Sequence, residues 1–267
     1  MPVRFCPIAS GSSGNCIYVC AGGTHILIDA GLSGKSIESG LNELKLTGRQ
    51  LSAILVTHEH TDHIMGVGVM SRRYGLPVYA TPNTWRYFER HGVIGVIKPN
   101  LIRRVEPERR FTIGCMQAVA FDIPHDASQP VGYSIFAENR KITIATDIGE
   151  PTDIIRRYIT DSDIVLIESN HDSDMLLNGK YPKYLKERIS GAHGHLSNIA
   201  AGTLLTESAT EKLRYIYLGH LSEENNRPLV ALNTVEDILI ERGVLPRVSL
   251  KVFIAQRNGI SDLVELQ

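Results

Sequence analysis

Residues 57–63 constrain this chain more than any other segment, because they read Thr-His-Glu-His-Thr-Asp-His. They directly follow residues 53–56 (Ala-Ile-Leu-Val), a short apolar run that predicts a buried strand. Imidazole and carboxylate groups are ligands for zinc, manganese and iron, and four of them leave this strand end together. A helix cap would need one such residue, and a structural zinc site would favour cysteine thiolates, which this segment lacks. The segment therefore predicts a metal centre at a strand end, where one loop could supply ligands to two metal positions.

The rest of the chain alternates strand-like runs with helical patterns, without repeats or low-complexity stretches. The expected helices are at residues 33–46, 61–74, 83–91, 152–158, 198–208 and 228–242. Residues 101–146 instead predict several strands joined by tight turns. Two sheets in the middle with helices outside would bury the apolar faces of both element types. Because no long linker interrupts the pattern, we expect a single domain over residues 1–267.

Composition narrows the class of protein. The 28 Lys+Arg and 29 Asp+Glu residues nearly cancel, so any binding to a polyanion must come from a local patch. No apolar run approaches the roughly 20 residues that span a bilayer, and the first residues lack the apolar region of a signal peptide. The four cysteines form no CxxC pair, which is typical of reduced thiols. We therefore expect a cytoplasmic protein that does not contact a membrane.

Further segments occur in the order in which the metallo-β-lactamase superfamily carries its functional residues, and the chain resembles that superfamily over nearly its whole length. Beside the HxHxDH segment these are residues 26–31 (Ile-Leu-Ile-Asp-Ala-Gly), 124–126 (Pro-His-Asp), 144–147 (Ile-Ala-Thr-Asp) and 218–220 (Leu-Gly-His). The resemblance implies an α/β (α+β) fold, a four-layer αββα sandwich with a dinuclear metal site along the sheet edges. The stretch between Asp147 and His220 leaves no room for the β-CASP insertion of RNA-processing relatives.

The resemblance also implies two divalent metal ions and their ligands. The ligands are His58, His60 and His125 for one metal, Asp62, His63 and His220 for the other, and Asp147 as a bridge. Asp29 would accept a hydrogen bond from a ligand histidine and so fix its tautomer. Taken alone, His125 could be an ordinary loop histidine, and Asp29 or Asp147 could be turn residues. Zinc, manganese and iron all suit this ligand set, so the metal stays open.

Three segments are similar to a narrower group, the YycJ/WalJ-type proteins, which resemble nucleases and are described as exonucleases that act on DNA from a 5′ end. They are residues 9–16, 57–60 and 219–226. Residues 191–198 (Gly-Ala-His-Gly-His-Leu-Ser-Asn) also resemble a segment of tRNA-processing relatives whose histidine assists the leaving oxygen. We assign that role to His195, because a leaving alkoxide needs a proton and imidazole titrates near neutral pH. The alternative is a surface or helix-capping role for His193 or His195.

Residues close to these segments are expected to contact the substrate. They are Asn15, Asn170, His171 and Ser197. Residues 10–15 offer backbone donors to a phosphate, although a hairpin turn explains them almost as well. The role of Glu168 stays open, because tRNA-processing relatives carry a different motif there. Residues 180–188 mix cations with two tyrosines, which suits contacts to nucleic acid or an ordinary solvated helix face.

The sequence thus predicts a metal-dependent phosphodiester hydrolase, a 5′-to-3′ DNA exonuclease in which two ions hold a hydroxide and clamp the scissile phosphate. Asp62 would be a ligand and would also orient the attacking water. The nearest alternative is a hydrolase of the same fold that acts on small phosphodiesters or thioesters. Redox relatives typically carry a carboxylate at the position of His60, and a regulatory binding protein would not need an intact ligand set.

Overall fold

The computed structural model describes residues 2–245 and 250–267 and divides the chain into two compact units. The first unit comprises Met1–Ala120, Ala127–Arg140 and Gln256–Gln267. The second unit comprises Phe121–Asp126 and Lys141–Ala255. The expectation of a single domain stays a prediction.

The first unit contains a seven-stranded sheet with the order β14-β1-β2-β3-β4-β5-β6. Its strands are β1 (Val3–Ala9), β2 (Cys16–Ala21), β3 (Thr24–Ile28), β4 (Ala53–Leu55), β5 (Val78–Ala80), β6 (Ile102–Arg104) and β14 (Val264–Leu266). Neighbours from β14 to β3 pair antiparallel, whereas β3, β4, β5 and β6 pair parallel. The carboxyl ends of these parallel strands share one edge of the sheet, which is where ligands bind in open α/β sheets.

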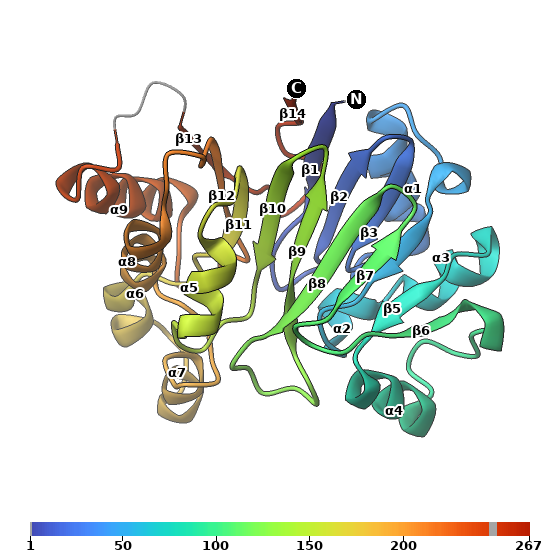
Figure 1. Cartoon of the computed structure of the whole chain (residues 1–267). Helices are drawn as coiled ribbons and strands as arrows, with labels where there is room; N and C mark the ends of the chain where they lie inside the picture. The colour runs from blue at the N-terminus through green and yellow to red at the C-terminus, as the bar shows by residue number, and fades with distance from the viewer. Residues whose placement is uncertain (1, 246–249) are drawn as a thin grey trace. The chain divides into compact units, whose positions relative to one another are not determined.

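Helices cover one face of this sheet (Figure 1). They are α1 (Gly34–Glu43), α2 (Thr61–Ile64), α3 (Val67–Tyr74) and α4 (Pro82–His91). Ile37 of α1, Met70 of α3 and Trp85 of α4 share one buried core with Leu27 and Ile54 of the strands. Burial of these large apolar side chains, at about 1.5–3 kcal/mol each, is what stabilises the helix layer on the sheet.

The single helix predicted at residues 61–74 is wrong, because the structure breaks it between α2 and α3. Gly66 lies at the break, and its backbone N–H donates to the Ala30 carbonyl at 2.7 Å. A Cβ at Gly66 would lie 2.4 Å from the Leu32 carbonyl oxygen, so only glycine permits this approach. The chain therefore bends where it packs against the segment that follows β3.

The first unit also contains β7 (Arg110–Ile113), β8 (Met116–Asp122) and β9 (Val131–Ala137), which belong to a second seven-stranded sheet. In the second unit the strands of that sheet are β10 (Arg140–Ala145), β11 (Ile164–Glu168), β12 (Tyr215–Gly219) and β13 (Lys251–Ile254), in the order β13-β12-β11-β10. All four pair parallel. Asp147, Glu168 and His220 stand at or just beyond the ends of three of them, so parallel pairing brings these residues to one edge.

Helices pack against this second group of strands. They are α5 (Asp153–Ile159), α8 (Asn198–Ser208) and α9 (Pro228–Glu241), and the second unit also contains the short helices α6 (Ser173–Asn178) and α7 (Lys183–Ile189). Ile155 of α5, Leu204 of α8 and Val235 of α9 share a buried core with Val165 and Ile216 of the strands. The predicted helices at residues 152–158, 198–208 and 228–242 are confirmed to within one residue at each end. Two sheets, each with its own helix layer, confirm the predicted αββα fold class.

One finding bears on membranes. Among the helices that the structure describes, none combines the length and the apolar character needed to cross a bilayer.

Candidate active site

Residues 58–63 gather three imidazoles at the carboxyl end of β4. The ring centroids of His58 and His63 are 4.1 Å apart, and those of His58 and His60 are 4.6 Å apart. His60 is the residue before α2, which places Asp62 and His63 in the first turn of that helix. His58 and His63 are buried, whereas His60 and Asp62 are half-buried. A strand end followed by a short helix thus turns one run of residues into a compact donor cluster.

Asp29 holds the ring of His63 in place. It follows β3 directly, and its Oδ2 accepts from His63 Nδ1 at 2.7 Å. The Thr57 backbone N–H and hydroxyl both donate to the same carboxylate at 2.8 Å. Burial raises the pKa of Asp29, and the interactions with His63 and Thr57 oppose that rise. Because Nδ1 carries the proton that Asp29 accepts, Nε2 of His63 is the nitrogen with a lone pair to offer.

Asn15 braces the same loop from the segment before β2. Its Oδ1 accepts from the Gly11 N–H at 3.0 Å, and its Nδ2 lies 3.1 Å from His63 Nε2. Its backbone N–H donates to the Asp62 carbonyl at 2.7 Å. Gly31 must be glycine here, because a Cβ would lie 1.6 Å from that carbonyl oxygen. The buried Asn15 side chain therefore positions residues 58–63, while its contact with substrate stays a prediction.

Glu168 organises the polar residues of the second unit. It ends β11 fully buried, and its Oε1 accepts from His195 Nδ1 and from His220 Nδ1, each at 2.8 Å. Its Oε2 accepts from the backbone N–H of Ile148 at 2.8 Å and of Leu196 at 3.1 Å. One carboxylate thus ties together the segments after β10, before α8 and after β12. The sequence left the role of this residue open; its only signal was a carboxylate that ends an apolar strand.

Glu168 and the histidines beside it shift one another's pKa values. Burial alone would raise its pKa, but His195 and His220 lower the pKa of Glu168 to about 2. Burial in turn would lower the pKa of His195, yet Glu168 and Asp147 raise it above its ordinary value. His195 therefore donates its Nδ1 proton to an ionised glutamate. Its Nε2 is left as the nitrogen that can pass a proton to another molecule.

Asp147 lies among the histidines of this unit. Its Oδ1 is 3.8 Å from His125 Nε2, 3.8 Å from His195 Nδ1 and 3.6 Å from His220 Nδ1. His125 donates from Nδ1 to the Gly194 carbonyl at 3.1 Å, and its Nε2 lies 3.3 Å from Asp126 Oδ1 as well as near Asp147. Burial lowers the pKa of His125, which favours the neutral imidazole that binds metals.

Three of the predicted residues share an unusual backbone conformation. Asp29, Asp147 and His220 have φ values of 59°, 58° and 54°, and they stand just after β3, β10 and β12. The left-handed region is costly for residues with a Cβ, by roughly 1–2 kcal/mol each. Such strain collects at functional sites, where the surrounding structure over-determines it. In this chain the positive φ occurs each time just after a strand, where the backbone turns a polar side chain toward a donor cluster.

The donor chemistry fits a divalent metal. In the second unit Asp147, Glu168, His195 and His220 each offer a ligand-type atom, and these atoms lie within 4.8 Å of one another. Since both oxygens of Glu168 already accept hydrogen bonds, this residue positions its neighbours instead of serving as an obvious ligand. Imidazole and carboxylate donors without thiolates suit zinc, manganese or iron. The His and Asp clusters of the two units therefore suit divalent metal binding.

The remaining predicted residues lie around the second cluster. Asn170 is buried and donates from Nδ2 to the His220 carbonyl at 2.9 Å. Ser197 caps α8 by accepting from the Ala200 N–H at 3.2 Å. His171 is 4% exposed, and burial lowers its pKa. Substrate contacts of Asn170, His171 and Ser197 stay predictions, and each has a structural contact or burial that explains its place.

Comparisons with known proteins agree with this arrangement. A family model described as the Metallo-beta-lactamase superfamily matches residues 9–220. Exodeoxyribonuclease YycJ from Bacillus anthracis is 38% identical over 251 residues, which cover 91% of each chain. Exodeoxyribonuclease WalJ from Streptococcus pneumoniae serotype 2 is 36% identical over 263 residues, which cover 98% of each chain. The crystal structure of the metallo-beta-lactamase fold protein YhfI from Bacillus subtilis matches with a TM-score of 0.74 at 16% identity, covering 99% of this chain and 100% of the other.

Proposed function

The chain belongs to the metallo-β-lactamase superfamily as a metal-dependent hydrolase, and we propose that its reaction is the stepwise hydrolysis of DNA from the 5′ end. The observation that carries this proposal is the identity of 36–38% to two exodeoxyribonucleases over 91–98% of the chain. The predicted resemblance to that group is confirmed by the same comparison. Nucleic acid is accordingly the substrate class that we assign to the site.

Two divalent ions belong to the proposal. Their ligands would be His58, His60, Asp62, His63, His125, Asp147 and His220, as the sequence predicts. Bound divalent ions would polarise the scissile phosphate and lower the pKa of a bound water far below that of bulk water, to about 7, which makes a nucleophile available at neutral pH. The two donor clusters support this assignment, each by its own geometry.

The side chains around the ions would divide the remaining work. Asp62 is half-buried in the first turn of α2, where its carboxylate can orient the attacking water as well as bind a metal. His195 would protonate the leaving oxygen from Nε2, since Glu168 holds the Nδ1 proton. Asp29 would keep the ring of His63 in its binding orientation by accepting from Nδ1.

Metal removal and reloading test the proposal. We expect the purified protein, stripped by a chelator, to lose hydrolysis of a single-stranded oligonucleotide and to regain it with Mn²⁺ or Zn²⁺. The His58→Ala/His60→Ala variant, purified in parallel, excludes a contaminating nuclease. Reloaded protein that hydrolyses bis(p-nitrophenyl) phosphate but leaves DNA intact would instead establish the alternative, a hydrolase of small phosphodiesters.

A further inference from the structure

We propose that a pocket on α4 binds the phosphates of the DNA strand that neighbour the cleaved bond. The pocket lies wholly in the first unit and has a volume of about 320 Å³. Its lining consists of Asn83, Arg86, Tyr87, Arg90, His91 and Ser128. The inference rests on the proposed function and adds to it the surface that holds the substrate.

The charge of the pocket suits a polyanion. Arg86 and Arg90 are exposed, and neither forms an ion pair with a carboxylate among the residues that the structure describes. The carboxylate of Glu89, which lies between them in sequence, is bound to Arg104 at 2.8 Å. Arg86 donates to the neutral Asn83 Oδ1, at 3.0 Å. Guanidinium groups without acidic partners are the preferred donors for phosphate oxygens.

The spacing of the side chains suits an extended strand. Arg86 and Arg90 are four residues apart on α4, which is about 6 Å along the helix axis. Tyr87 and His91 repeat the same interval, with ring centroids 4.3 Å apart. Each of these two turns thus contributes one cation and one ring. Grooves that bind single-stranded nucleic acid combine cations along the backbone with aromatic rings on which bases stack.

The pocket is tied to the predicted metal loop by hydrogen bonds. Ser128, one wall of the pocket, donates from its N–H and its hydroxyl to Glu59 Oε1, each at 2.6 Å. Glu59 stands between His58 and His60 in the chain. In addition, α4 follows β5, the parallel neighbour of β4, so both segments leave the same edge of the sheet. A phosphate in the pocket is therefore held beside the loop that carries the proposed ligands.

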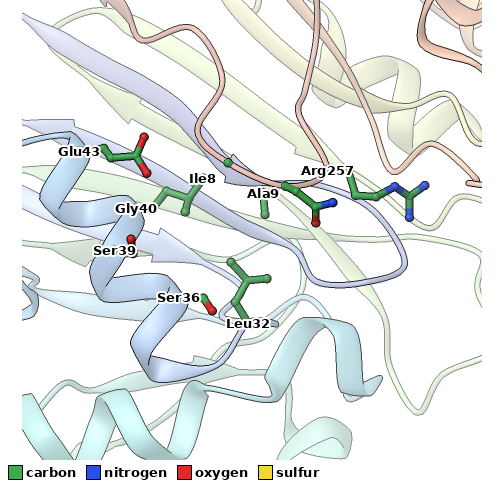
Figure 2. Close-up of a pocket in the computed structure, with 10 residues that line it drawn as sticks. Ile8, Ala9, Leu32, Ser36, Ser39, Gly40, Glu43 and Arg257 are labelled. Atoms are coloured by element: carbon green, nitrogen blue, oxygen red, sulfur yellow. The ribbon is translucent and has the colours of Figure 1, made fainter.

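Other candidate surfaces fit DNA less well. In residues 180–188, which the sequence suggested for this task, Lys183 lies 3.5 Å from Glu187 and Arg188 donates to Asp126 at 2.8 Å. These acidic side chains neutralise the positive charge that would attract a phosphate. A second cavity of the first unit, of about 290 Å³, has Glu43 and Arg257 on opposite sides, with Ile8 and Ala9 between them (Figure 2). Its opposite charges do not favour a polyanion.

The test reverses the two charges in the pocket. We expect Arg86→Glu/Arg90→Glu to raise the KM for a single-stranded oligonucleotide about 10- to 100-fold, because two charge-assisted contacts are lost. The slope of log KM against log salt concentration should fall by about 1.4, because each of the two lost phosphate contacts on a single strand contributes roughly 0.7 to that slope. Bis(p-nitrophenyl) phosphate has no neighbouring phosphate, so its turnover reports damage to the catalytic centre alone.

A matched control makes the same change of charge at the other edge of the sheet. Arg49 and Lys98 are exposed and precede β4 and β6, so Arg49→Glu/Lys98→Glu should leave the KM for DNA unchanged. Arg86→Lys/Arg90→Lys should keep most of the affinity. The inference is overturned if the wild type degrades DNA but the pocket variant and the control behave alike. It is equally overturned if the pocket variant loses turnover of both substrates to the same degree. A wild type that degrades no DNA defeats the proposed function itself.

Discussion

The donor cluster after β4 and the cluster around Glu168 contain similar imidazole and carboxylate groups, but the chain assembles them differently. In the first unit, the histidines and the aspartate come from one run, residues 58–63, and a short helix folds them together. In the second unit, the polar residues come from segments spread between residues 125 and 220, and one buried glutamate gathers two of their histidines. The first cluster is thus specified locally. The second depends on strand pairing and on a single acceptor.

The largest expected effect comes from the local cluster. Asp62→Ala should abolish hydrolysis of DNA and of bis(p-nitrophenyl) phosphate, because the residue is proposed both to bind a metal and to orient water. The measurement is turnover of both substrates together with the metal content of the purified variant. Near-normal turnover by a metal-replete Asp62→Ala protein would remove the residue from the mechanism.

The local cluster is also the part of the site that the sequence predicts best. The order and spacing of residues 57–63 are enough to indicate metal ligands, and the apolar run before them indicates a strand. The helices around them follow from capping and periodicity, as Ser33 shows by accepting from the Ser36 N–H at 3.1 Å. The sequence does not predict the break at Gly66, because it depends on a carbonyl that packs against it from a distant segment. The helix predicted to extend to residue 46 also ends earlier, at Glu43.

For the second cluster, the resemblance predicts which residues belong to the site, but the sequence does not predict their contacts. Nothing local shows that Asp147 and His220 adopt positive φ, since only a few per cent of residues with a Cβ do so, although aspartate and histidine are among the more frequent. Nothing local shows that Glu168 accepts from two histidines 27 and 52 positions away. The α4 pocket also depends on a distant contact, because one of its walls is Ser128, which donates to Glu59. Long-range contacts of this kind exist only once the sheets have paired.

The next effect tests the second cluster through His195, its half-buried histidine. His195→Ala should lower DNA turnover by about 10²–10⁴-fold, the usual span for a lost general acid, while metal content is kept. The loss should be much smaller for bis(p-nitrophenyl) phosphate, because p-nitrophenolate departs without a proton. His193→Ala, an exposed neighbour two residues away, is the matched control and should retain activity.

Equal losses on the two substrates would give His195 a role in holding phosphate instead. No loss on either substrate would leave the Glu168–His195 pair as a purely structural contact.

The smallest of the three effects addresses the acceptor that the sequence left open. Glu168→Gln keeps the shape of the side chain but weakens the hydrogen bonds that orient His195 and His220, which should cost about 10- to 100-fold in activity or metal affinity. Metal titration and DNA turnover measure the two losses separately. Glu187→Gln, at an exposed site on α7, is the control and should change neither. Unchanged metal affinity and turnover in Glu168→Gln would contradict the organising role of this glutamate.

End-labelled DNA shows directly whether hydrolysis starts at the 5′ end. Metal-loaded protein is mixed with one single-stranded oligonucleotide that carries its label at the 5′ end in one sample and at the 3′ end in the other. Hydrolysis from the 5′ end should release the 5′ label at once in the shortest products, while the 3′-labelled strand shortens progressively. Immediate release of the 3′ label, or internal cuts with both ends retained on long fragments, would contradict it.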